Sequence, residues 1–455
     1  MQTLFTSVSK FKQTYEDLLQ KNFLMDSPSL SQLREDSMGR LESHGFPNKK
    51  IKGWDYKSTA ILLKEDYVFG QKVVSDRLRS QLFNLLKYFD KKASRVIFVN
   101  GHFCEELSNL PSQLGVKVYS LKSLLSGEGS KQLCQKIEDL WKLEESDRGE
   151  AFTWLNSALC LDGCVISVEN DTNVESSIEV IHIQAGDLAQ WQASMCRNYF
   201  FIGEGAKINI TEGFVGLLGS KSFSNTVTCL RVEASAKVNY FKVQLEDKNS
   251  YHMSYTRTHI GERAQLNHLF FGSGAKFSRQ ELHSETGGPE AFMRADAIYL
   301  VQDDENMDMR TFINHPYKCG SSHQLFKGIA AGRSRVVFSG NIFIGEGAQK
   351  VDASQVNKTL LLSQSAEVDA SPELEIYADD VKATHGATVG YLDEEQIFYL
   401  ASRGISGTEA KILLAQGFAR EVFDNYFNVA PIVKTLAERV EWWVKENRPS
   451  FEGDK

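Results

Sequence analysis

The sequence predicts a mainly β protein whose core is a right-handed parallel β-helix, or solenoid, over residues 152–390. An N-terminal mixed, helix-rich domain (1–151) and a C-terminal helical domain (391–455) flank this core. Two observations predict the core: short runs rich in Val, Ile, Phe and Thr alternate with Gly, Ala, Ser and Asn turns, and a corner phrase recurs. That phrase is a small residue, Ala, a polar residue and an apolar one, and it returns at Ala206, Ala236, Ala264, Ala275, Ala348 and Ala366.

Stacked coils explain this recurrence. At a tight corner the small residue turns, the alanine packs inward and the next apolar residue starts a strand, so each coil buries its inner face on its neighbours. A Greek-key sandwich or jelly roll is the alternative, but it should show hairpin turns at regular spacing rather than one corner phrase. The chain of 455 residues is also too long for one ordinary compact core.

The N-terminal domain reads as mixed, with helix dominant. Apolar residues fall at helical spacing from Phe11 to Leu41, and again in the segment Ser130–Glu145. Between them, Arg95–Phe103 is a strand run into an Asn-Gly turn, which predicts a β-hairpin.

Strand character ends after Gly390. A helix containing Ile397 is followed by the break "RGIS", and then Ser406 and Glu409 form the capping box of a second helix. A last helix spans Ile432–Val444. Helices at the end of a solenoid cap the stack, dock a partner, or do both.

The composition of the chain excludes several classes of protein. The apolar content is 42% and the net charge is −8, which argues against disorder and against a nucleic-acid binder. No apolar stretch is long enough to span a membrane, and the N-terminus lacks the apolar run of a secretory signal. Seven scattered cysteines fit reduced thiols. We therefore expect a cytoplasmic protein that binds neither nucleic acid nor membrane.

One histidine stands out in "KATHGATVG", where the strands give way to helices. His385 lies between small residues, which leave space around its imidazole. Neutral imidazole is a good metal ligand when its other nitrogen is held by an acceptor. The plainer interpretation is a strand histidine bonded to a carbonyl.

Two other clusters have structural interpretations. The acidic run Val301–Arg310 is typical of a solvated turn, although facing carboxylates on a β-helix also occur in carbohydrate-active lyases and hydrolases. Such an enzyme is the alternative function. His315, Cys319 and His323 have metal-like spacing but need not converge in a strand-turn-strand context. No catalytic residue is assigned.

Longer phrases carry a resemblance. The segments "GFPNKKIKGWDY", "RVIFVNGHFCEELS", "ALCLDGCVISV" and "DEEQIFYLASRGIS", and the stretch Asn314–Phe423 as a whole, resemble the SufB/SufD family of SUF iron–sulfur cluster assembly scaffold proteins. SufB-like chains carry His-Glu-Ala where this chain has His385-Gly386-Ala387, and they hold a cysteine upstream, whereas Ala353–Thr384 contains none. The chain therefore resembles the SufD-like members.

The resemblance implies a non-catalytic scaffold subunit of a SufBCD complex. It implies pairing with a SufB-like subunit through the β-helix ends, and a transient nascent iron–sulfur cluster at that junction with His385 as a candidate ligand. It leaves open whether a flavin binds the assembled complex and whether the isolated chain forms a homodimer.

The resemblance also implies docking of a SufC-like ABC-type ATPase through the C-terminal helices. The residues expected at that surface are Arg403, Gly404, Ile405, Glu409, Ile412, Leu413, Gln416, Ala419, Val422 and Phe423.

Overall fold

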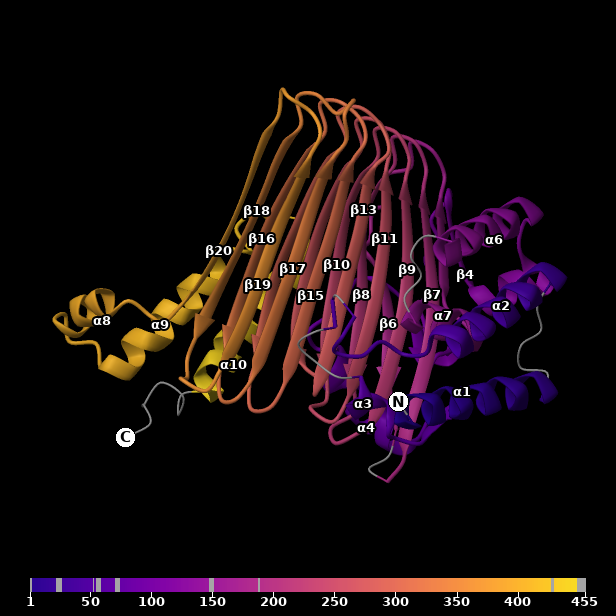
Figure 1. Ribbon diagram of the computed structural model, residues 1–455, viewed down its shortest axis with the longest axis horizontal. Helices are drawn as coiled ribbons and strands as arrows, with labels where there is room; N and C mark the ends of the chain where they lie inside the picture. Colours follow the sequence, from indigo (N-terminus) through magenta and orange to yellow (C-terminus); the bar gives the residue numbers. More distant parts are fainter. Residues whose placement is uncertain are drawn as a thin grey trace.

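In the computed structural model, the strands from β5 onward alternate between two facing sheets as the chain winds around one axis (Figure 1). The structure describes residues 2–21, 27–51, 53–54, 59–69, 74–146, 151–186, 189–426 and 429–447. From β5 on, the odd-numbered strands lie in one sheet (sheet A) and the even-numbered strands in the other (sheet B). Neighbouring strands within each of these series are parallel. The predicted parallel β-helix core is therefore confirmed.

Most strands are ten residues long, so each coil repeats nearly the same width. In sheet A the strands are β5 (Cys164–Val168), β7 (Trp191–Ile202), β9 (Ser222–Val232), β11 (Tyr251–Ile260), β13 (Phe277–Thr286), β15 (Asn306–His315), β17 (Arg335–Ile344) and β19 (Glu367–Ile376). In sheet B they are β6 (Ile178–Gln184), β8 (Lys207–Gly216), β10 (Lys237–Glu246), β12 (Gln265–Gly274), β14 (Phe292–Val301), β16 (Ser321–Ala330), β18 (Asp352–Leu361) and β20 (Lys382–Gly390).

The alanine phrases lie at the corners between strands, as predicted. All six alanines are buried, five of them completely and Ala366 at 8% exposure. The residue before four of them has a left-handed backbone, with φ of 66° at Gly205, 59° at Ser235, 55° at Arg263 and 84° at Gly274. This conformation turns the chain sharply, and the absence of a long side chain on the next residue lets coils stack closely.

The N-terminal region extends both sheets as well as supplying helices. Its elements are α1 (Gln2–Gln20), α2 (Pro28–His44), α3 (Ala60–Leu63), β1 (Tyr67–Phe69), α4 (Asp76–Leu86), β2 (Ser94–Val99), β3 (His102–Phe103), η1 (Glu105–Leu107), β4 (Val116–Ser120), α5 (Leu121–Ser123), η2 (Leu124–Glu128), α6 (Lys131–Ser146) and α7 (Ala151–Leu159). Strand β2 pairs with β6 and, antiparallel, with β3. Because Asn100 and Gly101 both have positive φ, they close the predicted hairpin.

Helix α7 departs from the sequence prediction, which began strand character at about Phe152. Eight of its nine residues, all except Trp154, are buried. An apolar segment that is buried on every side has no amphipathic period, so a buried helix and a buried strand look alike in sequence.

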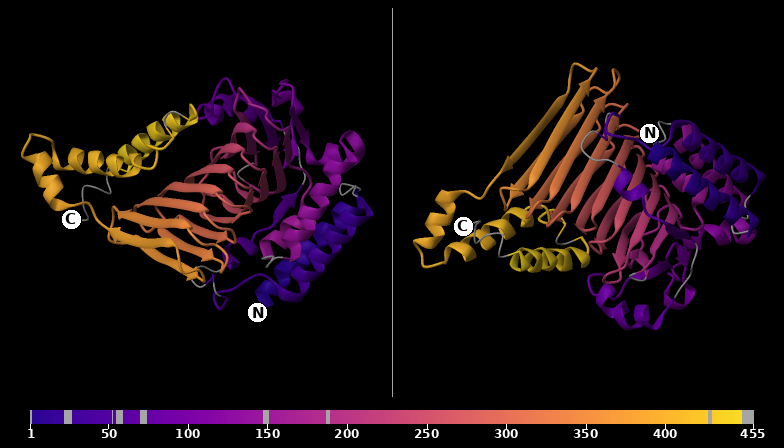
Figure 2. Two further views of the ribbon diagram at one scale, coloured as in Figure 1. Left: turned by 90° about the horizontal axis from the view of Figure 1, so that it is seen from above. Right: turned by 60° about the horizontal axis from the view of Figure 1, so that its bottom comes forward.

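Helices cover the outer faces of the two sheets on opposite sides of the solenoid (Figure 2). Side chains of α1, α2 and α7 pack with those of β7, β9 and β11 on sheet A. The C-terminal helices are α8 (Glu394–Ala401), α9 (Gly407–Arg420) and α10 (Ile432–Glu446). Helices α9 and α10 share one core with α4 and the apolar outer face of sheet B, whereas α8 lies away from the solenoid (Figure 1).

The described helices include none that is both long and apolar enough to cross a lipid bilayer.

Glu305, at the corner between β14 and β15, is expected to make the stability of the folded chain depend on pH. Its side chain is 6% exposed, and burial raises the pKa of its carboxyl from 4.5 to about 8. Between those values the unfolded chain is ionised at this position and the folded chain is protonated, so stability falls as pH rises. We expect Glu305→Gln to remove this dependence, because the amide oxygen can accept the same bond from the Gln302 backbone N–H (3.0 Å).

The measurement is urea unfolding of both chains between pH 4.5 and pH 8. The variant should match the wild type at the acid end and exceed it at the alkaline end. Parallel curves across this range would contradict the prediction.

Candidate functional site

His385 lies in β20, the last strand of sheet B, at one end of the solenoid. One edge of β20 pairs with β18, and no strand of the described residues pairs with the other edge. The side chains from Thr384 to Val389 are all exposed. A Cβ added at Gly386 would meet nothing within 4 Å. The strand therefore presents an open backbone edge with little side-chain bulk around the imidazole.

Strand β19 forms the other half of this open end. It is the terminal strand of sheet A and, among the strands that the structure describes, pairs with β17 alone. At the C-terminal end of β19, Ile376 is 41% exposed, and the next residue, Tyr377, is 61% exposed. We call β19 and β20 together the terminal coil. Its two free edges and exposed apolar side chains are unusual on a folded monomer, where strand edges are normally covered.

The register places His385 at the mouth of the solenoid interior. His385 pairs with Gln355 on β18, and Gln355 pairs with Gln324 on β16. Gln355 is completely buried and Gln324 is 3% exposed. Because in-register residues of parallel strands share a face, the imidazole belongs to the same inward column as these two amides.

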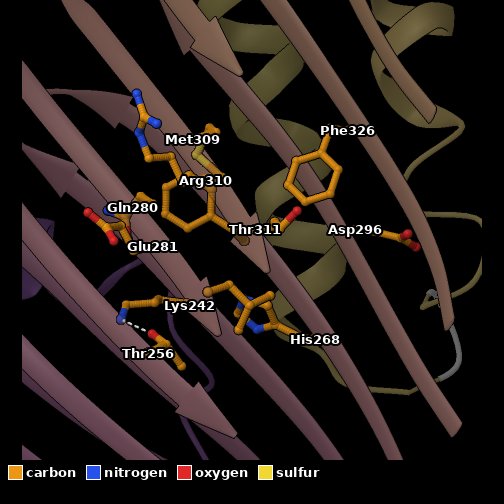
Figure 3. Close-up of a pocket in the computed structure, with 12 residues that line it drawn as sticks. Lys242, Thr256, His268, Gln280, Glu281, Asp296, Met309, Arg310, Thr311 and Phe326 are labelled. Atoms are coloured by element: carbon orange, nitrogen blue, oxygen red, sulfur yellow. Dashed lines mark hydrogen bonds between the residues drawn. The ribbon is translucent and has the colours of Figure 1, made fainter. Parts of the chain in front are cut away.

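This interior is polar along much of its length. Thr311 Oγ1 on sheet A donates to Gln324 Oε1 on sheet B at 2.9 Å, and Gln355 Nε2 donates to the same oxygen at 3.3 Å. Further along the axis, a cavity of about 20 Å³ lies among Lys242, His268 and Gln280, enough for one water molecule. Figure 3 shows Lys242 directed at Thr256 on the opposite sheet.

A buried ion pair lies next to this cavity. The Nζ of Lys242 is 3.3 Å from a Glu212 carboxylate oxygen, and it donates to Thr256 Oγ1 at 2.9 Å. Burial alone would raise the pKa of Glu212, but Lys242, His182 and hydrogen bonds from Tyr240 and Thr228 lower it to about 2. Burial lowers the pKa of Lys242, and Glu212 opposes that shift. The carboxylate is thus held ionised deep in the solenoid.

The C-terminal candidate residues divide into two groups. Arg403, Gly404 and Glu409 are exposed, Leu413 is 49% exposed, and Ile405, Ile412 and Gln416 are half-buried. By contrast, three residues at the end of the segment are essentially buried against sheet B: Ala419, Val422 and Phe423.

The local structure of this segment matches its sequence. Gly404 has φ of 86° at the break between α8 and α9, and Ser406 and Glu409 form the predicted capping box. Beside the break, Arg403 stacks on Tyr399 at 4.6 Å. The break sets the angle at which α8 leaves α9.

The sequence analysis missed two exposed aromatic residues on α8 as part of this surface. Phe398 is 75% exposed and Tyr399 is 55% exposed. A groove of about 470 Å³ between α9 and α10 is lined by the predicted residues Leu413 and Gln416 and also by Lys434. The sequence did contain a sign of this surface, the apolar run "IFYL" in a short helix. Of the residues of α8, only Ile397 is buried, so the aromatic residues of the run remain exposed.

The other sequence clusters do not converge on a site. Asp304 pairs with Arg333 (2.9 Å), and Asp308 pairs with Arg279 (2.9 Å). His315 bonds Ser322 inside the solenoid, while His323 bonds Ser354. Within the described ranges, no group of three or more His, Cys, Asp or Glu side chains could hold a metal ion.

Comparison with known proteins covers nearly the whole chain. The family profile described as "SufBD protein N-terminal region" matches residues 6–180. The profile described as "SUF system FeS cluster assembly, SufBD core domain" matches residues 182–418. The second range takes in His385 and most of the C-terminal candidate surface.

Individual relatives agree with these matches. The chain is 30% identical to the iron–sulfur cluster assembly protein SufD of Escherichia coli, over 83% of this chain and 85% of that protein. It is 28% identical to a SufBD family protein of Synechocystis, over 86% of each chain. It is 27% identical to the chloroplastic protein ABCI7 of Arabidopsis thaliana, over 92% of this chain and 87% of the relative.

These matches give no support to the carbohydrate-active alternative, because the profiles and the first two relatives are named for iron–sulfur cluster assembly. The β-helix with its open terminal coil, the helices that flank it and the two profile matches lead to one conclusion. The chain belongs to the SufBD family of the SUF iron–sulfur cluster assembly system, and it is a homologue of SufD.

Proposed function

We propose that this chain is a non-catalytic, SufD-type scaffold subunit that works in the cytoplasm within a SufBCD-type complex. The observation that carries the proposal is the open terminal coil, with His385 exposed on its last strand. A scaffold needs a surface on which a second chain completes a site, and an unpaired strand edge is such a surface.

The SufB-like subunit is the partner proposed for the terminal coil. Unpaired N–H and C=O groups on β19 and β20 favour continuation of both sheets by another chain. Small residues at Ala383, Gly386 and Ala387 leave room for that chain beside the imidazole. The nascent iron–sulfur cluster is the cargo of this junction. His385 supplies one ligand, and the partner supplies the others, because a single imidazole cannot hold a cluster.

The SufC-like ATPase is the partner proposed for the C-terminal helices. We take the exposed apolar side chains of Phe398, Tyr399 and Leu413 on α8 and α9 as the docking patch, and the exposed Arg403 and Glu409 as its polar rim. An aromatic centre with a polar rim is typical of protein interfaces. The buried residues Ala419, Val422 and Phe423 hold the patch on sheet B instead of contacting the partner.

The ATPase patch can be tested by a surface substitution. We expect Leu413→Asp to weaken binding of the SufC-like subunit by about tenfold or more, because a carboxylate would be desolvated at the centre of the patch. Pull-down and calorimetric titration measure this. Leu114→Asp is the matched control, because Leu114 is a 94% exposed leucine of the N-terminal region and lies outside the C-terminal helices. It should bind the SufC-like subunit as the wild type does. Equal affinity of the Leu413→Asp variant and the wild type would rule out the patch as the docking site.

Co-expression tests the function as a whole. The chain is produced with SufB-like and SufC-like subunits, and the complex is separated by size exclusion and analysed for iron. We expect one complex that contains all three chains and acquires iron and sulfide. A chain that elutes alone or as a homodimer in the presence of both subunits would argue against the proposed function.

A further inference from the structure

The amide of Gln355 is fixed in one orientation inside the solenoid. Its Nε2 donates to Gln324 Oε1 at 3.3 Å and to Thr311 Oγ1 at 3.4 Å. On the facing sheet, Gly340 leaves the space that this amide fills, since a Cβ there would lie 2.2 Å from Gln355 Nε2 and 2.6 Å from its Oε1. The two hydrogen bonds direct the N–H groups at the previous coil and at sheet A.

This orientation leaves the other end of the amide without a partner. Gln355 Oε1 is buried and accepts no hydrogen bond from the described residues. A buried acceptor left unsatisfied destabilises the folded state. The next residue in the same inward column is His385, which pairs with Gln355 in the strand register. Neighbouring strands lie about 4.8 Å apart, so rotation of the exposed imidazole can bring a ring N–H to this oxygen.

The same arrangement recurs on the outer surface of this protein. Asn267 Nδ2 donates to Asn239 Oδ1 at 2.9 Å, and Asn239 Nδ2 donates to Asn209 Oδ1 at 2.8 Å. In this ladder each residue donates to the oxygen of the preceding coil. The Gln324 and Gln355 pair follows the same direction, and His385 stands where the next donor belongs.

We propose that Gln355 is a positioning residue for His385: its Oε1 accepts one ring N–H of the imidazole and holds the ring in a single tautomer. Neutral imidazole has one N–H and one free lone pair. Holding the N–H toward Gln355 directs the lone pair out of the solenoid mouth, toward whatever docks on the terminal coil. The use of that lone pair for a cluster rests on the proposed function, whereas the tautomer does not.

Two other side chains on β18 provide an internal control. Asn357 Oδ1 and Thr359 Oγ1 are also buried without a hydrogen-bond partner among the described residues. In the register they face Ala387 and Val389, which have no polar group to offer. Gln355 is thus distinguished from Asn357 by its neighbour on β20 and not by its burial.

The test is nitrogen NMR of the isolated full-length chain labelled with ¹⁵N only in histidine. The His385 signals are assigned by their loss in His385→Gln. In the wild type we expect one protonated and one unprotonated ring nitrogen, with little averaging between them. Gln355→Leu should average the two signals.

Asn357→Leu is the matched control, because it removes a buried amide from the same strand. It should leave the His385 signals as in the wild type. Identical His385 signals in wild type and Gln355→Leu, or equal averaging in Asn357→Leu, would overturn the proposal. Since no partner or cluster is present, a negative result would not bear on the complex, and failure of cluster assembly in His385→Ala would not bear on the tautomer.

Discussion

Replacing His385 by alanine is expected to lower the iron and sulfide content of the co-purified complex by about tenfold or more. Loss of residues that only orient a metal ligand already costs about 10–100-fold in affinity, so loss of a ligand should cost at least as much. The complex itself should assemble normally, because the side chain is exposed and Ala383 and Ala387 on the same strand show that alanine fits this face.

Thr388→Ala is the control for this experiment, since it truncates another exposed side chain of β20. It should retain the wild-type iron content. Full cluster assembly by the His385→Ala complex would remove the proposed ligand role, while leaving the pairing through the terminal coil intact. A complex that fails to form would instead indicate a structural role for the imidazole in docking.

The second large effect concerns the stability of the solenoid. We expect Lys242→Met to destabilise the fold by about 3–5 kcal/mol, because it leaves the Glu212 carboxylate buried without its cation. Glu212 is completely buried, and Lys242 is 2% exposed. The double variant Glu212→Gln with Lys242→Met should recover much of the loss, since it removes both charges together. Denaturant unfolding of the wild type, the single variant and the double variant measures these differences.

The pH dependence of this pair has a definite sign. In the wild type, the pKa of Glu212 is about 2 against an ordinary 4.5, so its contribution to stability is present above pH 4.5 and is lost as pH falls toward 2. Without Lys242, burial is opposed only by His182 and by the hydrogen bonds of Tyr240 and Thr228, so the pKa of Glu212 lies higher and the variant gains less stability as pH rises. The gap between the two chains should therefore be wider at neutral pH than at pH 4. If the difference in stability between the wild type and the variant did not change with pH, Lys242 would not be the group that lowers the pKa of Glu212.

The stack itself could be predicted from sequence because its corners repeat. Ala206, Ala236 and Ala264 recur with turn residues before them, and the physical demand for a small inward residue is the same at each corner. The capping box at Ser406 was equally readable, because a cap depends on residues three apart. Such local rules need no knowledge of the rest of the fold.

Other features depend on neighbours that are remote in sequence. In the sequence, Phe423 and Leu413 belong to the same apolar stripe at helical spacing. In the structure, Phe423 is buried on sheet B while Leu413 is exposed. A helical stripe shows that a face is apolar and does not show what covers it. The pairing of Gln355 with His385 depends on a strand register across a corner, which periodicity alone cannot supply.

The stacking of the coils determines where local unfolding of the solenoid begins. In a solenoid each coil is stabilised mainly by its immediate neighbours, and β19 and β20 have a neighbour on one side only. Amide hydrogens there should exchange with solvent fastest, and protection should grow coil by coil toward the α7 end. Fraying that begins at His385 would make the imidazole easy to reach before docking and would tie its ordering to the arrival of the second subunit.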